Sequence, residues 1–92
     1  MSYYVYIIQS DVDGSFYKGF SEDPLKRLWQ HNHGESTFTS AKIPWRLVYV
    51  EILLTKKEAL IREKNLKKAT KERITALLLH PKNIVLQFVE NK

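Results

Sequence analysis

The chain has 92 residues, enough for one domain with a modest hydrophobic core and too few for two. It contains no cysteine, which excludes disulfide bridges and thiolate zinc sites and is typical of intracellular proteins. The formal net charge is +5, no apolar stretch reaches the length of about 18 residues that spans a membrane, and no signal peptide precedes the first apolar run. We therefore expect a cytoplasmic protein without a membrane partner.

Two strand-like runs open the chain, at Tyr3–Ile8 and Phe16–Phe20. Both are rich in aromatic and β-branched residues, which favour strands. The Asp-Gly pair at residues 13–14 predicts that they form a β-hairpin. Because side chains alternate between the faces of a strand, we expect Tyr6 and Tyr17 on the same face, directly opposite each other or diagonal.

The next element is a predicted helix. Asp23 is a good N-cap and Pro24 suits the first helical position, so the helix should begin here and end at Gly34. Arg27 and His31 lie one turn apart on one of its faces. Three apolar residues with i, i+3 and i+4 spacing are expected to form its buried stripe: Leu25, Leu28 and Trp29.

A polar stretch rich in helix and strand breakers follows at residues 33–40, where we expect a loop. Trp45–Leu53 predicts a third strand, and apolar residues on both of its faces indicate that it is covered. Thr55 and Glu58 match a capping box, which predicts a second helix running to about Lys68.

Thr70 is expected to cap a third helix over residues 71–79. The apolar run at 84–89 predicts either a late strand or an irregular segment packed on the core. The order β-β-α-β-α-α indicates an α+β fold, a small antiparallel sheet covered by helices. We expect a single domain over residues 1–92, with its core at about 3–80 and a short C-terminal tail at 81–92.

The positive charge is concentrated in the second half of the chain. Residues 1–45 hold four Lys or Arg against five Asp or Glu, whereas residues 46–92 hold eleven against five. Such a basic stretch is typical of a surface that binds a polyanion, most often nucleic acid. A solvated helix face with surplus lysine explains the charge about equally well.

Glu63 lies in the apolar stripe of the second predicted helix, between Ala59 and Leu66. A carboxylate in such a stripe is costly unless it is paired, hydrogen-bonded or bound to a cation. Spacing alone leaves two interpretations open, an ion pair with Arg27 or a lysine, and a metal site.

Five side chains together supply what phosphodiester hydrolysis requires: Tyr6, Tyr17, Arg27, His31 and Glu63. A hard carboxylate holds a divalent cation, an arginine binds the scissile phosphate, and a phenol or imidazole handles the proton of the attacking water. The sequence carries no Gly-rich phosphate loop, no nucleophilic Ser-His-Asp set and no His/Cys cluster. Taken singly, each of the five also has an ordinary structural explanation.

As an ordered set these residues resemble the GIY-YIG nuclease family, most closely its small single-domain bacterial members. The residues at 4–6 represent the first half-motif and those at 17–19 the second, although Tyr4 stands in place of a glycine and Lys18 in place of an isoleucine. The stretch 44–49 resembles the family's third strand. The resemblance covers residues 3 to about 80.

The resemblance implies a three-stranded antiparallel sheet flanked by helices and a metal-dependent endonuclease that cuts DNA by attack of a single water. It implies that Glu63 binds Mg²⁺ or Mn²⁺ and that Arg27 steadies the phosphate. Tyr17 or Tyr6 would activate or orient the water, with His31 assisting proton transfer. An unperturbed tyrosine pKa near about 10 is too high for a base at neutral pH, so a nearby cation would have to lower it.

Gly19, the glycine of the second half-motif, is expected at a structural turn beside the site. The expected contacts to nucleic acid, most readily to DNA phosphates, are made by lysines: Lys18, Lys57, Lys64, Lys67 and Lys68. Such contacts would be strongly salt-dependent. Two alternatives stay open, a nucleic-acid-binding domain of the same fold without turnover and a protein-interaction adaptor that needs neither metal nor DNA.

Overall fold

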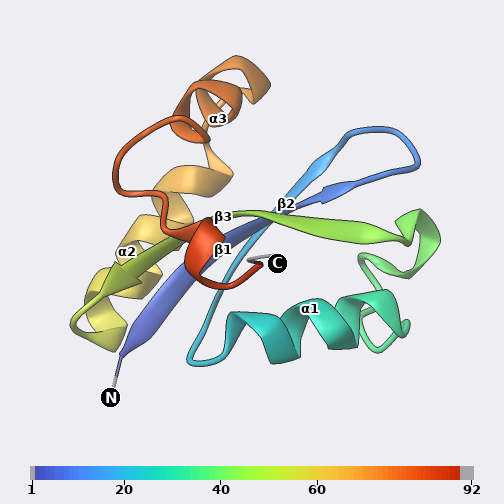
Figure 1. Cartoon of the computed structure of the whole chain (residues 1–92), viewed down its shortest axis with the longest axis horizontal. Helices are drawn as coiled ribbons and strands as arrows, with labels where there is room; N and C mark the ends of the chain where they lie inside the picture. The colour runs from blue at the N-terminus through green and yellow to red at the C-terminus, as the bar shows by residue number, and fades with distance from the viewer. Residues whose placement is uncertain (1, 90–92) are drawn as a thin grey trace.

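The computed structural model describes residues 2–89 (Figure 1). Its helices and strands follow in the order β1 (Tyr3–Ser10), β2 (Phe16–Ser21), α1 (Pro24–Asn32), β3 (Trp45–Leu53), α2 (Lys56–Lys67) and α3 (Lys71–Leu77). Short 3-10 turns lie at Ser40–Lys42 and Val85–Gln87. The predicted α+β class and element order are confirmed. None of the helices in this part of the chain has the length and apolar character needed to cross a membrane.

The three strands form one antiparallel sheet in the order β2-β1-β3, so β1 is central and β2 and β3 are edges. Tyr6 pairs with Gly19 and Ile8 pairs with Tyr17. Tyr6 and Tyr17 are therefore diagonal neighbours on one face of the sheet, as the hairpin pattern predicted.

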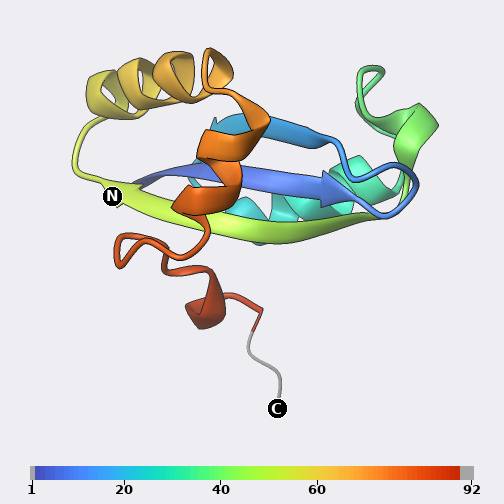
Figure 2. The same ribbon diagram turned by 90° about the horizontal axis from the view of Figure 1, so that it is seen from above.

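Helices cover both faces of the sheet (Figures 1 and 2). On one face, Val5 and Ile7 of β1 pack with Ala59 and Leu66 of α2 and Ile74 of α3. The other face carries a second apolar cluster, which includes residues of all three strands and is covered by α1 and the C-terminal segment: Tyr6, Ile8, Trp45, Leu47 and Val50, with Tyr17, Leu28, Ile84, Val85 and Phe88 against them. The central strand is thus buried on both sides.

All three predicted N-caps are confirmed. The side chains of Asp23, Thr55 and Thr70 each accept a hydrogen bond from the backbone N–H three residues later. Such a cap satisfies one of the N–H groups that a helix leaves unpaired in its first turn. The starts of α1, α2 and α3 therefore follow from local sequence.

The buried stripe of α1 differs from the prediction. Leu25 and Trp29 are 44% and 54% exposed, whereas Pro24 and His31 are buried and Leu28 packs against the second cluster. Pro24, Leu28 and His31 also follow helical spacing, as i, i+4 and i+7. This stripe is buried because the ring nitrogens of His31 find hydrogen-bond partners on that side of α1, Tyr6 of the sheet and Thr39 of the following loop, which removes the cost of burying a polar side chain.

The C-terminal segment is the irregular packed segment of the two alternatives, not a strand. Asn83 attaches it to β3: its Oδ1 accepts from the N–H of Val50 at 3.1 Å, and its Nδ2 donates to the carbonyl of Val48 at 3.0 Å. The N–H of Ile84 donates to the carbonyl of Val50 at 2.8 Å. Packing therefore continues past residue 80, where the sequence placed the end of the core, as far as Phe88.

Candidate active site

Tyr6 lies across Gly19 on the sheet face covered by α1. A Cβ built on Gly19 would be 2.6 Å from the Tyr6 hydroxyl oxygen and 2.7 Å from its Cζ. Only glycine leaves room for the ring, which can therefore extend over β2 toward the edge of the sheet. The predicted turn at Gly19 is wrong, because the residue lies inside β2 and its role is this close approach.

His31 connects Tyr6 to the loop that follows α1. Its Nε2 is 2.9 Å from the Tyr6 hydroxyl oxygen, and its Nδ1 is 2.8 Å from Oγ1 of Thr39. Tyr6, His31 and Thr39 are all 1% exposed or less. Burial, followed by the positive charge of Arg27, lowers the pKa of His31 to about 4, so the imidazole is neutral at pH 7.

The Tyr6 hydroxyl is the point on which the predicted residues converge. Burial raises the pKa of Tyr6 to about 12, against the opposing effect of the nearby Arg27 cation. Tyr17 and Glu63 are close enough for their charges to act on the Tyr6 pKa as well. The structure therefore brings all five predicted residues into one neighbourhood, from β1, β2, α1 and α2.

Tyr17 is the more accessible of the two phenols. Its ring packs edge-on against His31, with centroids 4.9 Å apart, and against Trp45 at 6.5 Å. It is half-buried, whereas Tyr6 is 1% exposed. Two different environments therefore surround the two tyrosines on the same face.

Glu63 forms an ion pair with Lys67, one turn later on α2, at 3.4 Å. An ion pair with a lysine is one of the interpretations that spacing left open. Within residues 2–89, Glu63 makes no ion pair with Arg27, whose guanidinium donates instead to Oε1 of Gln30. The Glu63 side chain is 17% exposed and that of Lys67 56% exposed. Such a long, half-exposed pair is worth at most about 1 kcal/mol, so it leaves the carboxylate available to another cation.

Metal binding at Glu63 would need ligands from outside the protein. In the part of the chain that the structure describes, no group of three His, Cys, Asp or Glu side chains is placed to hold a metal ion. Mg²⁺ commonly binds one or two carboxylates and completes its shell with water and substrate phosphate oxygens. A single partly exposed carboxylate in the neighbourhood of an arginine fits that donor set.

Three lysines of α2 and the lysine at its C-cap point away from the sheet. At about 100° per residue, Lys67 lies about 40° around the helix from Glu63 and the other three lie about 100–140° from it, whereas Arg62 lies about 100° away in the opposite direction. These lysines are exposed: Lys57, Lys64, Lys67 and Lys68. Lys18, on β2, pairs with Ile7 and therefore lies on the α2 side of the sheet, opposite to Tyr17.

Arg62 forms a partly buried ion pair that the sequence did not predict. Its Nε donates to Oε1 of Glu51 on β3 at 3.0 Å, and the Tyr49 hydroxyl donates to the same oxygen at 2.6 Å. Glu51 is only 6% exposed. Because Arg62 reaches toward β3, the neighbouring Glu63 is directed to the other side of α2. A glutamate within the apolar β3 run was the signal that pointed to this pair.

A shallow cavity of about 280 Å³ lies apart from the five predicted site residues, at the β3 edge. None of the predicted site residues lines this cavity. Its lining consists of Glu51, Ile52, Leu53, Lys82 and Ile84. The chemistry-bearing groups instead gather toward β2, the opposite edge of the sheet.

Known proteins resemble this chain over most of its length. The sequence pattern of the GIY-YIG catalytic domain matches residues 2–75. A UPF0213 protein of Staphylococcus saprophyticus is 38% identical over 77 residues, 83% of this chain and 93% of its own. A UPF0213 protein of Staphylococcus aureus is 38% identical over 78 residues, 84% of this chain and 94% of its own. The solution NMR structure of a UPF0213 protein from Bacillus halodurans aligns with a TM-score of 0.55 at 32% identity, covering 85% of this chain and 83% of that one.

Proposed function

This chain belongs to the GIY-YIG family, a nuclease family, and on that premise we propose that it is a divalent-metal-dependent endonuclease that hydrolyses phosphodiester bonds in DNA. The observation that carries the proposal is the convergence of two tyrosines, an arginine, a histidine and a glutamate around one buried hydroxyl. Each group has a chemical task that the others do not perform.

Glu63 is the residue that would hold the divalent cation, through the carboxylate that Lys67 engages only weakly. When bound, such a cation neutralises phosphate charge and lowers the pKa of a water in its shell. Arg27 binds the scissile phosphate, because its guanidinium lies beside the Tyr6 hydroxyl and donates to phosphate oxygens in a planar fork. It also stabilises the charge that develops there during cleavage.

Tyr6 and His31 receive the proton of the attacking water. Tyr6 passes its own proton to Nε2 of His31 and takes up the proton that the water loses, so the proton ends on the imidazole. In the resting protein the proton stays on Tyr6, because the gap between pKa values of about 12 and about 4 amounts to on the order of 10 kcal/mol. Positive charge brought to the site favours the phenolate and so lowers the phenol pKa. Tyr17, the more accessible phenol, orients the water.

The exposed lysines of α2 bind the DNA backbone next to the site. Contacts to phosphates carry no base information, so this surface binds without sequence preference and weakens steeply as salt rises. DNA with an accessible, irregular backbone, such as branched, damaged or single-stranded DNA, is the substrate class that we propose.

Plasmid nicking and cleavage of branched DNA test the proposal with Mg²⁺, with Mn²⁺ and with chelator. Wild type should cut only with metal, and Arg27→Ala and Glu63→Ala should each abolish cutting. Glu72→Ala, which removes an exposed carboxylate on α3, is the matched control and should cut normally. Salt-sensitive DNA binding without cutting on any substrate would contradict the enzyme and favour a binding domain of the same fold.

A further inference from the structure

A continuous hydrogen-bonded chain runs from the sheet into the loop after α1. It joins the Tyr6 hydroxyl, both ring nitrogens of His31 and the Thr39 hydroxyl, at 2.9 Å and 2.8 Å. Oγ1 of Thr39 continues it to the carbonyl of Ser36 at 3.5 Å. All three side chains are almost fully buried, so water cannot easily replace any of these bonds.

The direction of this chain depends on the tautomer of His31. A neutral imidazole has one N–H donor and one acceptor nitrogen. If Nε2 carried the hydrogen, it would donate to Tyr6, and the Tyr6 hydrogen would need another acceptor. Arg27 is nearby but is a donor only, and among residues 2–89 the Tyr6 hydroxyl has no hydrogen-bond acceptor besides His31.

The opposite tautomer satisfies every hydrogen. Tyr6 then donates to Nε2, Nδ1–H donates to Oγ1 of Thr39, and the Thr39 hydroxyl donates to the Ser36 carbonyl, which is the weakest of the three bonds because of its length. We propose that Thr39 is a positioning residue, whose hydroxyl accepts the hydrogen of His31 Nδ1 and thereby keeps Nε2 free to accept the proton of Tyr6. The catalytic consequence rests on the proposed function, whereas the tautomer does not.

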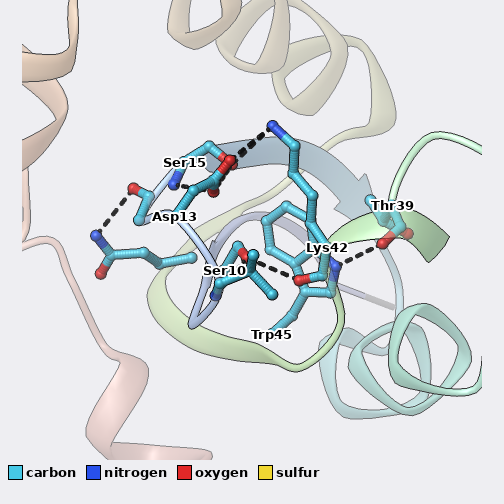
Figure 3. Close-up of polar contacts among 9 residues, drawn as sticks. Ser10, Asp13, Ser15, Thr39, Lys42 and Trp45 are labelled. Atoms are coloured by element: carbon cyan, nitrogen blue, oxygen red, sulfur yellow. Dashed lines mark hydrogen bonds and ion pairs between the residues drawn. The ribbon is translucent and has the colours of Figure 1, made fainter.

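The surrounding structure holds Thr39 in place for this task. Its carbonyl accepts the indole N–H of Trp45 at 2.9 Å (Figure 3). The segment between them is anchored to the hairpin tip, where Lys42 pairs with Asp13 at 3.0 Å and its carbonyl accepts from Ser10 Oγ at 2.7 Å (Figure 3). Threonine at a fixed backbone position presents its hydroxyl in few rotamers, so the partner of Nδ1 is defined.

The tautomer can be measured without DNA or metal, from long-range ¹H–¹⁵N correlation spectra of the imidazole rings near pH 7.5. The other two histidines are internal references. Nδ1 of His80 accepts from the N–H of Lys82 at 3.0 Å, so its hydrogen should be on Nε2. Nδ1 of His33 lies 2.7 Å from the carbonyl of Trp29, to which it must donate. His31→Gln assigns the signals.

We expect His31 to show the Nδ1–H pattern, like His33 and unlike His80. Thr39→Val, which keeps the shape but removes the hydroxyl, should shift His31 toward the Nε2–H tautomer, and Thr39→Ser should retain the wild-type pattern. An Nε2–H pattern in the wild type, or an unchanged pattern in a folded Thr39→Val protein, would overturn the proposal. The wild-type spectrum decides the question even if Thr39→Val does not fold.

Nicking kinetics test the catalytic consequence separately. Loss of a hydrogen bond that orients a functional histidine commonly costs about 10- to 100-fold, so kcat should fall by that factor in Thr39→Val with KM within about twofold. Thr39→Ser should recover most of kcat. A tautomer change without a fall in kcat would overturn the positioning role, whereas absence of nicking in the wild type would contradict the proposed function and leave the tautomer result standing.

Discussion

Gly19→Ala is expected to damage the site through sterics alone. The new Cβ would lie 2.6 Å from the Tyr6 hydroxyl oxygen and 2.9 Å from its Cε2, whereas ordinary contact begins at 3.4 Å. The ring must therefore move by up to about 0.8 Å to relieve the overlap. It has little freedom to do so, because Tyr6 is 1% exposed and its hydroxyl is hydrogen-bonded to His31.

The cost follows from this displacement. Overpacking a filled core typically lowers the free energy of unfolding by about 1–3 kcal/mol, and we expect Gly19→Ala to fall in that range. Moving the phenol also disturbs the geometry of its 2.9 Å bond to His31. A catalytic group displaced by about 1 Å can cost about 100-fold in rate, so nicking should fall by that order.

Urea unfolding and the nicking assay measure the two effects, with Gly34→Ala as the matched control. Gly34 has φ of +75° and no atom within 4 Å of its Cβ position, so alanine there should cost about 1–2 kcal/mol through backbone strain and leave nicking unchanged. If the Gly19→Ala protein had the same free energy of unfolding and the same nicking rate as the wild type, the argument that only glycine leaves room for the Tyr6 ring would be refuted.

Three further predictions concern charge. The free energy of unfolding should fall by on the order of 3 kcal/mol as pH drops from about 6.5 to about 4, because the unfolded state protonates His31 at the higher value and the folded state only at the lower one. His31→Gln should remove this component, and equal pH slopes in the two proteins would contradict it. Arg62→Ala should lower the free energy of unfolding by about 3 kcal/mol, because it leaves the buried Glu51 carboxylate without its ion-pair partner. Lys67→Ala should lower it by about 1 kcal/mol or less, and equal losses in the two variants would argue against the Arg62–Glu51 pair. Lys64→Ala should reduce the slope of log affinity for DNA against log salt by about 0.9, and an unchanged slope would mean that it contacts no phosphate.

Local sequence determined the elements of this protein. Asp23, Thr55 and Thr70 bond the N–H three residues later, an interaction contained within a single helical turn, so the helix starts could be predicted. The hairpin pattern placed Tyr6 and Tyr17 on one face, directly opposite each other or diagonal, and the observed register makes them diagonal neighbours. The ordered motif residues then indicated the family and the five groups of the candidate site.

Tertiary structure alone decided how those groups are held. Two stripes of α1 have helical spacing, and the one containing His31 is buried because Tyr6 and Thr39 supply partners for its ring, from another strand and from a loop. Gly19 is needed for the ring on the neighbouring strand rather than for a turn. Glu51 and Arg62 are eleven residues apart, and only the packing of α2 on the sheet brings them together. Spacing within a segment encodes contacts over about one helical turn or one strand pair, whereas the partner of a buried polar group depends on which elements pack against it.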